Sequence, residues 1–150
     1  FSDYGVLYPV QTFNKNVEVD LSKTPICIES NTKKMQDMLQ EIACKISENV
    51  LKITSEQRKK IHIAAVFSCN FSNHMFTIAE EILEKENINF SIMLPLINQT
   101  INKLKYNKAK SVQTGPAKRK DIAIIEDHLQ NIHNKEIKAI YKKISQHIMQ

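Results

Sequence analysis

Residues 61–79, IHIAAVFSCNFSNHMFTIA, carry imidazole, amide and hydroxyl side chains but no Lys, Arg, Asp or Glu. On a helical wheel at about 100° per residue, Cys69, Asn73 and Thr77 lie within roughly 60° of His62, and Asn70 lies near 80°. Such side chains form hydrogen bonds without carrying a full charge. Because a buried polar group without a partner costs about 1–3 kcal/mol, the pattern indicates a face that is covered and bonds to its cover.

Three kinds of cover fit this uncharged polar face: another subunit, another domain, or a small polar ligand in a cleft. A fourth interpretation is a set of polar side chains that satisfy one another inside a structural helix bundle. A zinc site from His62, Cys69 and His74 is a weak alternative, because separations of seven and five residues lack the usual paired-ligand spacing. No fourth ligand suggests itself, so we expect no metal.

The elements that must position these residues begin with two short strands. The stretches YGVLYPVQTF (residues 4–13) and PICIES (25–30) contain β-branched and aromatic residues, with Gly5 and Pro9 inside the first. Residues 32–51 then place apolar side chains at steps of three and four, which predicts an amphipathic helix with Asn31 as its N-cap.

A second, longer helix is predicted over residues 55–86. Thr54 and Gln57 form a capping-box pattern at its start. One face is expected to pack in the core and carries Ala64, Phe67, Phe71, Met75, Ile78 and Ile82. Further helices are predicted over residues 90–106, after a capping Asp121, and at the C-terminal end, and residues 107–120 are predicted to form a loop.

The composition is that of a globular domain. The chain has 150 residues, of which 42% are hydrophobic and 25% charged, and no apolar run is long enough to cross a bilayer, so we expect no membrane association. The three cysteines show no CxxC spacing, which favours reduced thiols and a cytoplasmic location.

The net charge of +5 is concentrated in one region. Residues 87–120 contain no Asp or Glu and include Lys103, Lys105, Lys108, Lys110, Lys118, Arg119 and Lys120. These lysines are not interleaved with aromatic residues, apart from Tyr106, and no recognition motif accompanies them, so no nucleic-acid partner is expected. The turn TGPAKR could instead bind an anion through the Thr114 hydroxyl, backbone amides near Gly115 and the Arg119 side chain; a plain interhelix loop is the alternative.

Four stretches, in their order and spacing, resemble one known family. They are LYPVQTF (7–13), RKKIHIAAVFSCNFSNHMF (58–76), LPLINQT (94–100) and QTGPAKRKD (113–121). Together they resemble the C-terminal half of a family of bacterial NADP-dependent oxidoreductases, in which an N-terminal Rossmann domain is joined to an uncharacterised helical domain. The resemblance covers essentially the whole chain, which begins at Phe1, so we expect the chain to be part of a longer protein.

The resemblance implies a mainly α fold, a multi-helix bundle similar to the C-terminal domains of 6-phosphogluconate dehydrogenase and ketopantoate reductase. One or two short N-terminal strands would remain from the Rossmann half. Residues 1–30 would link to that absent domain, and residues 31–150 would form a helical domain for substrate binding and homodimerisation. The rival hypothesis is a non-catalytic helical interaction module whose polar face is satisfied by a second copy.

The resemblance also implies roles for individual residues. In the relatives, a Lys and an Asn on the long helix meet the substrate; here His62 and Asn70 occupy a comparable place, and no Lys lies in the uncharged stretch. A histidine with an ordinary pKa near 6.5 can exchange a proton with a substrate oxygen while an asparagine orients that oxygen. Asn73, Thr114 and Arg119 are expected to bind a small polar or anionic substrate, and Gln11 to lie near the cofactor.

The implied cofactor is NADP or NAD, bound by the parent protein and not by this chain alone. The chain has two glycines, Gly5 and Gly115, so it cannot contain the GxGxxG turn that holds a dinucleotide pyrophosphate. The N-terminal Rossmann domain is therefore an expected partner of the chain.

Overall fold

The computed structural model describes residues 2–150, which form two compact units, Phe1–His74 and Met75–Gln150. The first unit combines a small sheet with helices, and the second is helical. This division falls inside a helix, between His74 and Met75. The mainly helical composition with strands near the N-terminus agrees with the expectation from the sequence.

The sheet of the first unit has three strands where the sequence predicted one or two. Strands β1 (Gly5–Pro9), β2 (Ile26–Ser30) and β3 (Val50–Lys52) lie in that order, β1 antiparallel and β3 parallel to β2. A short 3₁₀ turn, η1 (Leu21–Lys23), precedes β2. Helix α1 (Lys33–Ile46) makes the crossover that parallel strands require, so β2, α1 and β3 form a βαβ unit.

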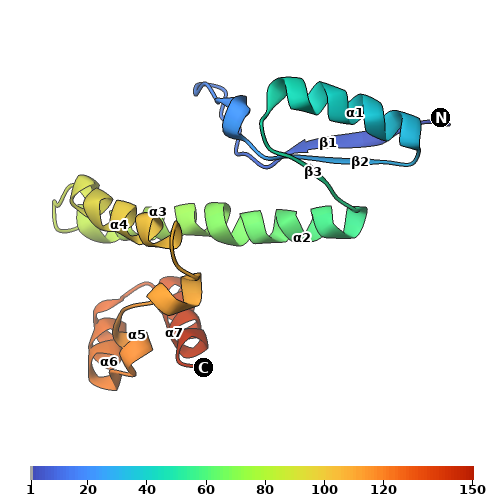
Figure 1. Ribbon diagram of the computed structural model, residues 1–150. Helices are drawn as coiled ribbons and strands as arrows, with labels where there is room; N and C mark the ends of the chain where they lie inside the picture. Colours follow the sequence, from blue (N-terminus) through green and yellow to red (C-terminus); the bar gives the residue numbers. More distant parts are fainter. Residues whose placement is uncertain (1) are drawn as a thin grey trace. The chain divides into compact units, whose positions relative to one another are not determined.

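Helix α1 covers one face of the sheet and builds the core there (Figure 1). Ile26, Ile28 and Ala43 are fully buried, with Leu7, Leu39 and Val50 packed around them. Full burial of one isoleucine side chain stabilises a fold by about 1.5–3 kcal/mol. The N-cap of α1 is Thr32, whose hydroxyl accepts from the Met35 amide. The predicted cap, Asn31, instead accepts from the Tyr4 amide and so joins the start of β1 to the end of β2.

The predicted helix over residues 32–51 is wrong at its C-terminal end. Helix α1 ends at Ile46 because buried Ser47 turns the chain: its hydroxyl donates to the Thr24 carbonyl at 2.6 Å and accepts from the Asn49 amide at 3.0 Å. Val50 continues the helical spacing of apolar residues by coincidence, since it reaches the same core from β3. Hydrogen bonding by one serine therefore overrides the periodicity.

Helix α2 lies along the opposite face of the sheet from α1 (Figure 1). The helical run predicted over residues 55–86 extends over α2 (Ser55–Ala65), a π-helical segment η2 (Val66–Phe71) and α3 (Ser72–Glu84). The capping box of Thr54 and Gln57 is confirmed. The expectation that its apolar face packs in the core is wrong for Phe67 and Phe71, which are 66% and 49% exposed. Met75 and Ile78 of the same predicted face are half-buried.

The second unit follows the predicted order of helices with changed ends. The segment predicted as one helix over 90–106 divides into a 3₁₀ turn η3 (Phe90–Met93) and α4 (Leu94–Leu104). The predicted loop contains η4 (Ala109–Val112) and the single helical turn α5 (Pro116–Arg119), followed by α6 (Ile122–Asn131) and α7 (Lys135–Ile148). No helix within residues 2–150 combines the length and the apolar character needed to cross a membrane.

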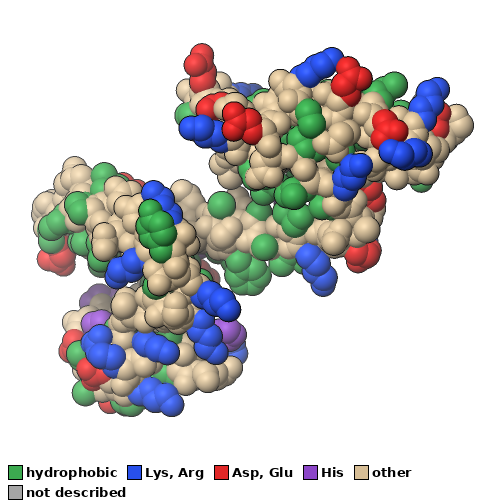
Figure 2. Space-filling view, viewed as in Figure 1, with side chains coloured by type: hydrophobic (Ala, Val, Ile, Leu, Met, Phe, Trp, Pro, Cys, Tyr) green, Lys and Arg blue, Asp and Glu red, His purple; other side chains and the backbone are tan. Residues whose placement is uncertain are grey.

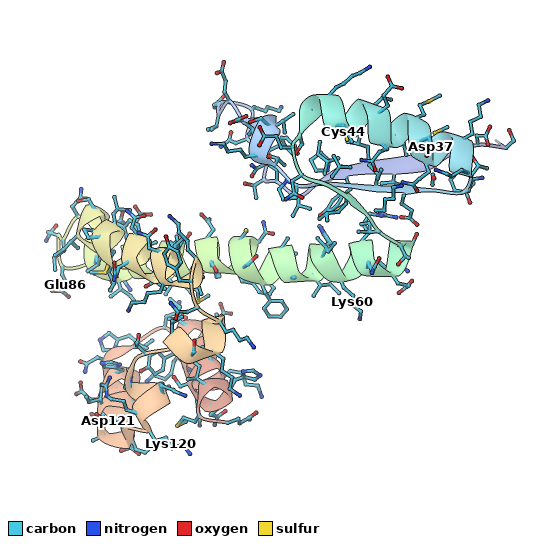
Figure 3. The ribbon with its side chains drawn as sticks, in the orientation of Figure 1. Asp37, Cys44, Lys60, Glu86, Lys120 and Asp121 are labelled. Carbon is cyan, nitrogen blue, oxygen red and sulfur yellow. The ribbon has the colours of Figure 1, made fainter. Side chains whose placement is uncertain are left out.

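Helices α5, α6 and α7 pack against one another in the second unit. The Tyr141 hydroxyl on α7 lies 2.8 Å from the His128 Nδ1 on α6. Ala117 on α5 and Ile125 on α6 are buried. Lys120, labelled in Figure 3, adopts a left-handed conformation with φ 57° and ψ 36° and ends α5. Asp121 next to it caps α6, as predicted, by accepting from the Ile124 amide.

Gly5 is required by the close approach of α1 to β1. A Cβ atom at this position would lie 2.5 Å from Leu39 Cδ1 and 2.7 Å from the backbone oxygen of Glu29. We therefore expect Gly5→Ala to lower the free energy of unfolding by about 1–3 kcal/mol, the usual range for overpacking. Urea denaturation followed by circular dichroism measures this. Lys34→Ala, on the exposed side of α1, is the control, and equal stability of the two variants would contradict the packing account.

Candidate functional site

A cleft of about 500 Å³ in the first unit brings three of the sequence-predicted site residues together. One wall is the end of β1 and the residues after it, and the other is formed by α2 and the π segment. The cleft is lined by Tyr8, Pro9, Val10, Gln11, Thr12, Phe13, His62, Ala65, Cys69 and Asn70. His62, Asn70 and Gln11 therefore line the same cleft.

Tyr8 is a member of this site that the sequence reasoning missed. Its hydroxyl lies 3.3 Å from Nδ1 of His62, and either atom can be the donor, depending on the histidine tautomer. The Nε2 atom of His62 has no hydrogen-bond partner within residues 2–150, and the His62 side chain is exposed. The period of two in β1 could have found Tyr8, since it faces away from Leu7 and hence away from the α1 core.

The π segment explains why Asn70, and not Asn73, lines the cleft with His62. A π turn takes one residue more than an α turn, so residues beyond it are rotated back by about 100° relative to an uninterrupted α-helix. Asn70 lies inside the π segment, so it undergoes only part of this rotation, which moves it from near 80° on the ideal wheel toward His62. Asn73 lies beyond the segment and is carried away from its ideal position near 20°. Asn73 is not among the lining residues.

Side-chain hydroxyls support the irregular backbone of the π segment. The Ser72 hydroxyl donates to the Phe67 carbonyl at 3.3 Å, and the Ser68 hydroxyl lies 3.5 Å from the Ala65 carbonyl. Serine side chains commonly bond backwards to helical carbonyls in this way. The serines of the uncharged stretch therefore help to hold the helix geometry.

Gln11 lies in the cleft with its side chain already engaged. Its Nε2 donates to the Thr24 hydroxyl at 3.4 Å, and its Oε1 accepts from the Thr12 amide at 2.8 Å. These bonds fix the backbone at the mouth of the cleft. An amide held in this way can still offer its second N–H to a ligand.

Glu29 on β2 fixes the start of α2 and thereby the position of His62. Its carboxylate accepts a short hydrogen bond from the Ser55 hydroxyl and another, at 3.3 Å, from Arg58 Nε. The Ser55 hydrogen bond, with smaller contributions from Arg58 and against an opposing effect of burial, lowers the pKa of Glu29 below its ordinary value of 4.5. The side chain is 23% exposed, so this contact is a partly shielded ion pair.

The predicted residues Thr114 and Arg119 belong to the second unit. Thr114 and Gly115 line an apolar cavity of about 270 Å³ together with isoleucines of α3 and α7, whereas Arg119 is exposed and does not line it. Gly115 has φ 101°, a conformation that glycine adopts without strain. The two side chains are thus not gathered around one pocket of this unit.

No group of three or more His, Cys, Asp or Glu side chains within residues 2–150 could hold a metal ion. The cleft itself is lined by imidazole, amide, hydroxyl, thiol and apolar groups, and no Lys, Arg, Asp or Glu is among its lining residues. The lining side chains can therefore form hydrogen bonds and exchange a proton, but offer no permanent charge.

The family model described as "Domain of unknown function (DUF2520)" matches residues 24–148. The chain belongs to this family. The matched range includes the wall of the cleft formed by α2 and the π segment. It does not include the other wall, residues 8–13. Among curated proteins, none matches the chain.

Two solved structures resemble this DUF2520 chain. A "putative NADP oxidoreductase" from Bacteroides fragilis shares 42% identity and superposes with a TM-score of 0.94 over 98% of this chain and 57% of the Bacteroides chain. A protein of Thermotoga maritima shares 20% identity with a TM-score of 0.77 over 96% of this chain and 59% of its own, a likeness of fold. The chain thus spans a little over half the length of these proteins.

Glu29→Gln is expected to weaken the dependence of the free energy of unfolding on pH at acid pH, here called the acid limb. Because the folded-state pKa of Glu29 lies below 4.5, its contribution is fully present above that value and is lost as the pH falls through the lower, folded-state pKa. The free energy of unfolding, measured by urea titration between neutral and acid pH, should therefore fall less steeply with pH in Glu29→Gln than in wild type.

The control for this experiment is Glu41→Gln, which removes an exposed pair with Lys45. Exposed pairs of this kind contribute about 0–1 kcal/mol, so this variant should keep the wild-type acid limb. The same acid limb in Glu29→Gln and wild type would show that the Ser55 and Arg58 contacts do not stabilise the ionised carboxylate.

Proposed function

We propose that this DUF2520 chain is the substrate-binding and dimerisation portion of an NADP-dependent oxidoreductase. The observation that carries the proposal is the cleft that gathers His62, Asn70 and Tyr8 where the π segment faces the residues after β1. The likeness to the Bacteroides fragilis protein supports the reaction class. The cytoplasmic location and the N-terminal Rossmann partner belong to the same proposal.

In this proposal, His62 exchanges a proton with a substrate oxygen through Nε2. The Tyr8 hydroxyl, 3.3 Å from Nδ1, holds the ring in place and leaves Nε2 for the substrate. Asn70 orients the same oxygen by donating an amide N–H. A positioned general acid or base of this kind accelerates a reaction by about 10²–10⁴-fold.

The substrate that fits the cleft best is polar and uncharged where it reacts. The lining offers hydroxyl, amide and imidazole groups beside the apolar surfaces of Pro9, Val10 and Phe13, and no side chain with a permanent charge. A carboxylate or phosphate bound there would lose water without gaining a cationic partner, which is costly. A hydroxyl or carbonyl group next to an apolar portion meets what the cleft supplies.

NADP does not fit the residues of this chain. With two glycines in 150 residues, no GxGxxG turn exists to receive a pyrophosphate, so the proposal assigns the dinucleotide to a part of the protein outside this sequence. Within residues 2–150, no strand pairs with the outer edge of β1 or of β3. Strand edges are normally covered, so a strand from a preceding Rossmann domain is a suitable neighbour.

Dimerisation is proposed for an apolar stripe on α2 and the π segment, formed by Ile63, Phe67 and Phe71. Their exposed fractions are 51%, 66% and 49%, and the two phenylalanine rings form an edge-to-face pair with centroids 5.1 Å apart. Contiguous exposed aromatic surface of this kind is typical of protein interfaces. If the oxidoreductase role fails, a helical interaction module that uses this stripe is the alternative function.

Asn70→Leu in the longer natural protein tests the role of the cleft. We expect turnover to fall by about tenfold or more, because the variant loses a hydrogen bond to the reacting oxygen, while the protein keeps its wild-type oligomeric state. Steady-state kinetics and sedimentation velocity measure the two quantities. Ser91→Leu, exposed on η3, is the control. A change of oligomeric state with unchanged turnover would instead make this face an interface.

Phe67→Ser combined with Phe71→Ser tests the proposed interface. Removal of two exposed rings should weaken self-association by more than tenfold, since buried aromatic anchors often contribute about 2 kcal/mol or more each. Sedimentation equilibrium of the isolated chain measures the dissociation constant. Lys59→Ser combined with Lys60→Ser, on the same helix, is the matched control, and equal self-association of the two double variants would exclude the stripe.

A further inference from the structure

A second cavity, in the second unit, collects positive charge. It has a volume of about 430 Å³ and lies between the η4–α5 segment and the end of α7. Its lining residues are Lys110, Gln113, Lys118, His147, Ile148 and Gln150. None of them lines the cleft of the first unit or takes part in the proposed reaction.

The two lysines of this cavity have no partner within the part of the chain that the structure describes. Lys110 and Lys118 take part in none of the ion pairs or side-chain hydrogen bonds there, whereas Lys33, Lys45 and Lys59 each pair with a nearby carboxylate. No Asp or Glu side chain is among the lining residues. No lining side chain therefore neutralises the positive charge of Lys110 and Lys118.

The surrounding sequence keeps carboxylates away from the cavity. Lys110 and Lys118 lie in the stretch 87–120, which contains seven Lys and Arg and no Asp or Glu. Figure 2 shows Lys and Arg side chains gathering on the visible face of the second unit. A concave site of one charge sign concentrates oppositely charged ligands.

We propose that this cavity binds the phosphate group of a small molecule. Lysine ammonium groups act as point charges for phosphate oxygens, and the His147 ring and one N–H of Gln113 can complete the hydrogen bonds. The other N–H of Gln113 already donates to the Thr114 carbonyl at 3.0 Å, which holds the amide in place. The volume lies within the range of about 300–1,000 Å³ that is usual for small-molecule sites.

The alternative is that Lys110 and Lys118 are simply solvated side chains near the carbonyl end of α7 and bind no ligand. Basic side chains are favoured there by the helix dipole without any ligand. In that case, lysine removal would lower the thermal stability slightly and would leave no saturable phosphate binding to lose. The two accounts therefore differ in a binding measurement and not only in stability.

The test is a titration of the ¹⁵N-labelled chain with inorganic phosphate at constant ionic strength, followed by amide chemical shifts. Saturable shifts should appear within residues 109–118 and 146–150. Lys110→Ala combined with Lys118→Ala should weaken binding by about tenfold or more, because each charged hydrogen bond contributes about that factor. Lys142→Ala combined with Lys143→Ala makes the same change in net charge on α7 and should keep the affinity within about twofold.

Two results would overturn the proposal. The first is a set of linear shifts spread over lysines throughout the chain, or an equal loss in both double variants, which would indicate unspecific screening. The second is saturable binding of a random oligonucleotide that inorganic phosphate, added at the same concentration of charge, fails to displace. A polymer would then be the true ligand. Unchanged thermal midpoints in both double variants verify that the comparison concerns folded chains.

Discussion

The attachment of α2 to the sheet through Glu29 is the contact on which the candidate site depends. The carboxylate on β2 binds Ser55 and Arg58 in the first turns of α2, while the capping box of Thr54 and Gln57 fixes the same helix start. From that anchor the helix runs along the sheet face that carries Tyr8, and His62 arrives 3.3 Å from its hydroxyl. A helix start held at one polar contact thus sets the position of a proton-exchanging side chain two turns later.

The π segment is the second constraint on the site. Asn70 of this segment lines the cleft with His62, and Phe67 and Phe71 of the same segment are exposed and do not line the cleft. Such segments are less stable than α-helix and are found frequently at functional sites. Bonds from serine hydroxyls to backbone carbonyls reduce that cost here. One local irregularity therefore serves both the cleft and the apolar stripe.

Much of this arrangement could be predicted from the sequence, because local signals agree with the fold. The capping box, the Asp121 cap and the period of the helices gave most element starts correctly. Strand β3 could not be predicted, since Val50 fits a helical spacing and the turn depends on a contact from Ser47 to Thr24, far apart in the sequence. The pairing of Tyr8 with His62 depends on tertiary structure, and the place of Asn70 in the cleft on the π segment. A helical wheel at 100° per residue describes neither. The βαβ unit therefore depends on tertiary contacts that the sequence pattern does not contain. His62 and Asn70, in contrast, could be selected from their residue types and from the family resemblance.

The central claim is that the cleft of the first unit receives the reacting group of a polar substrate. The most direct measurement is a crystal structure of this chain, together with the proposed Rossmann partner, with NADP and a bound substrate or inert analogue. The account predicts a substrate oxygen within about 2.6–3.2 Å of His62 Nε2 and of the Asn70 amide nitrogen. An analogue bound elsewhere, with Nε2 of His62 hydrogen-bonded to a protein group or to a second subunit, would contradict it.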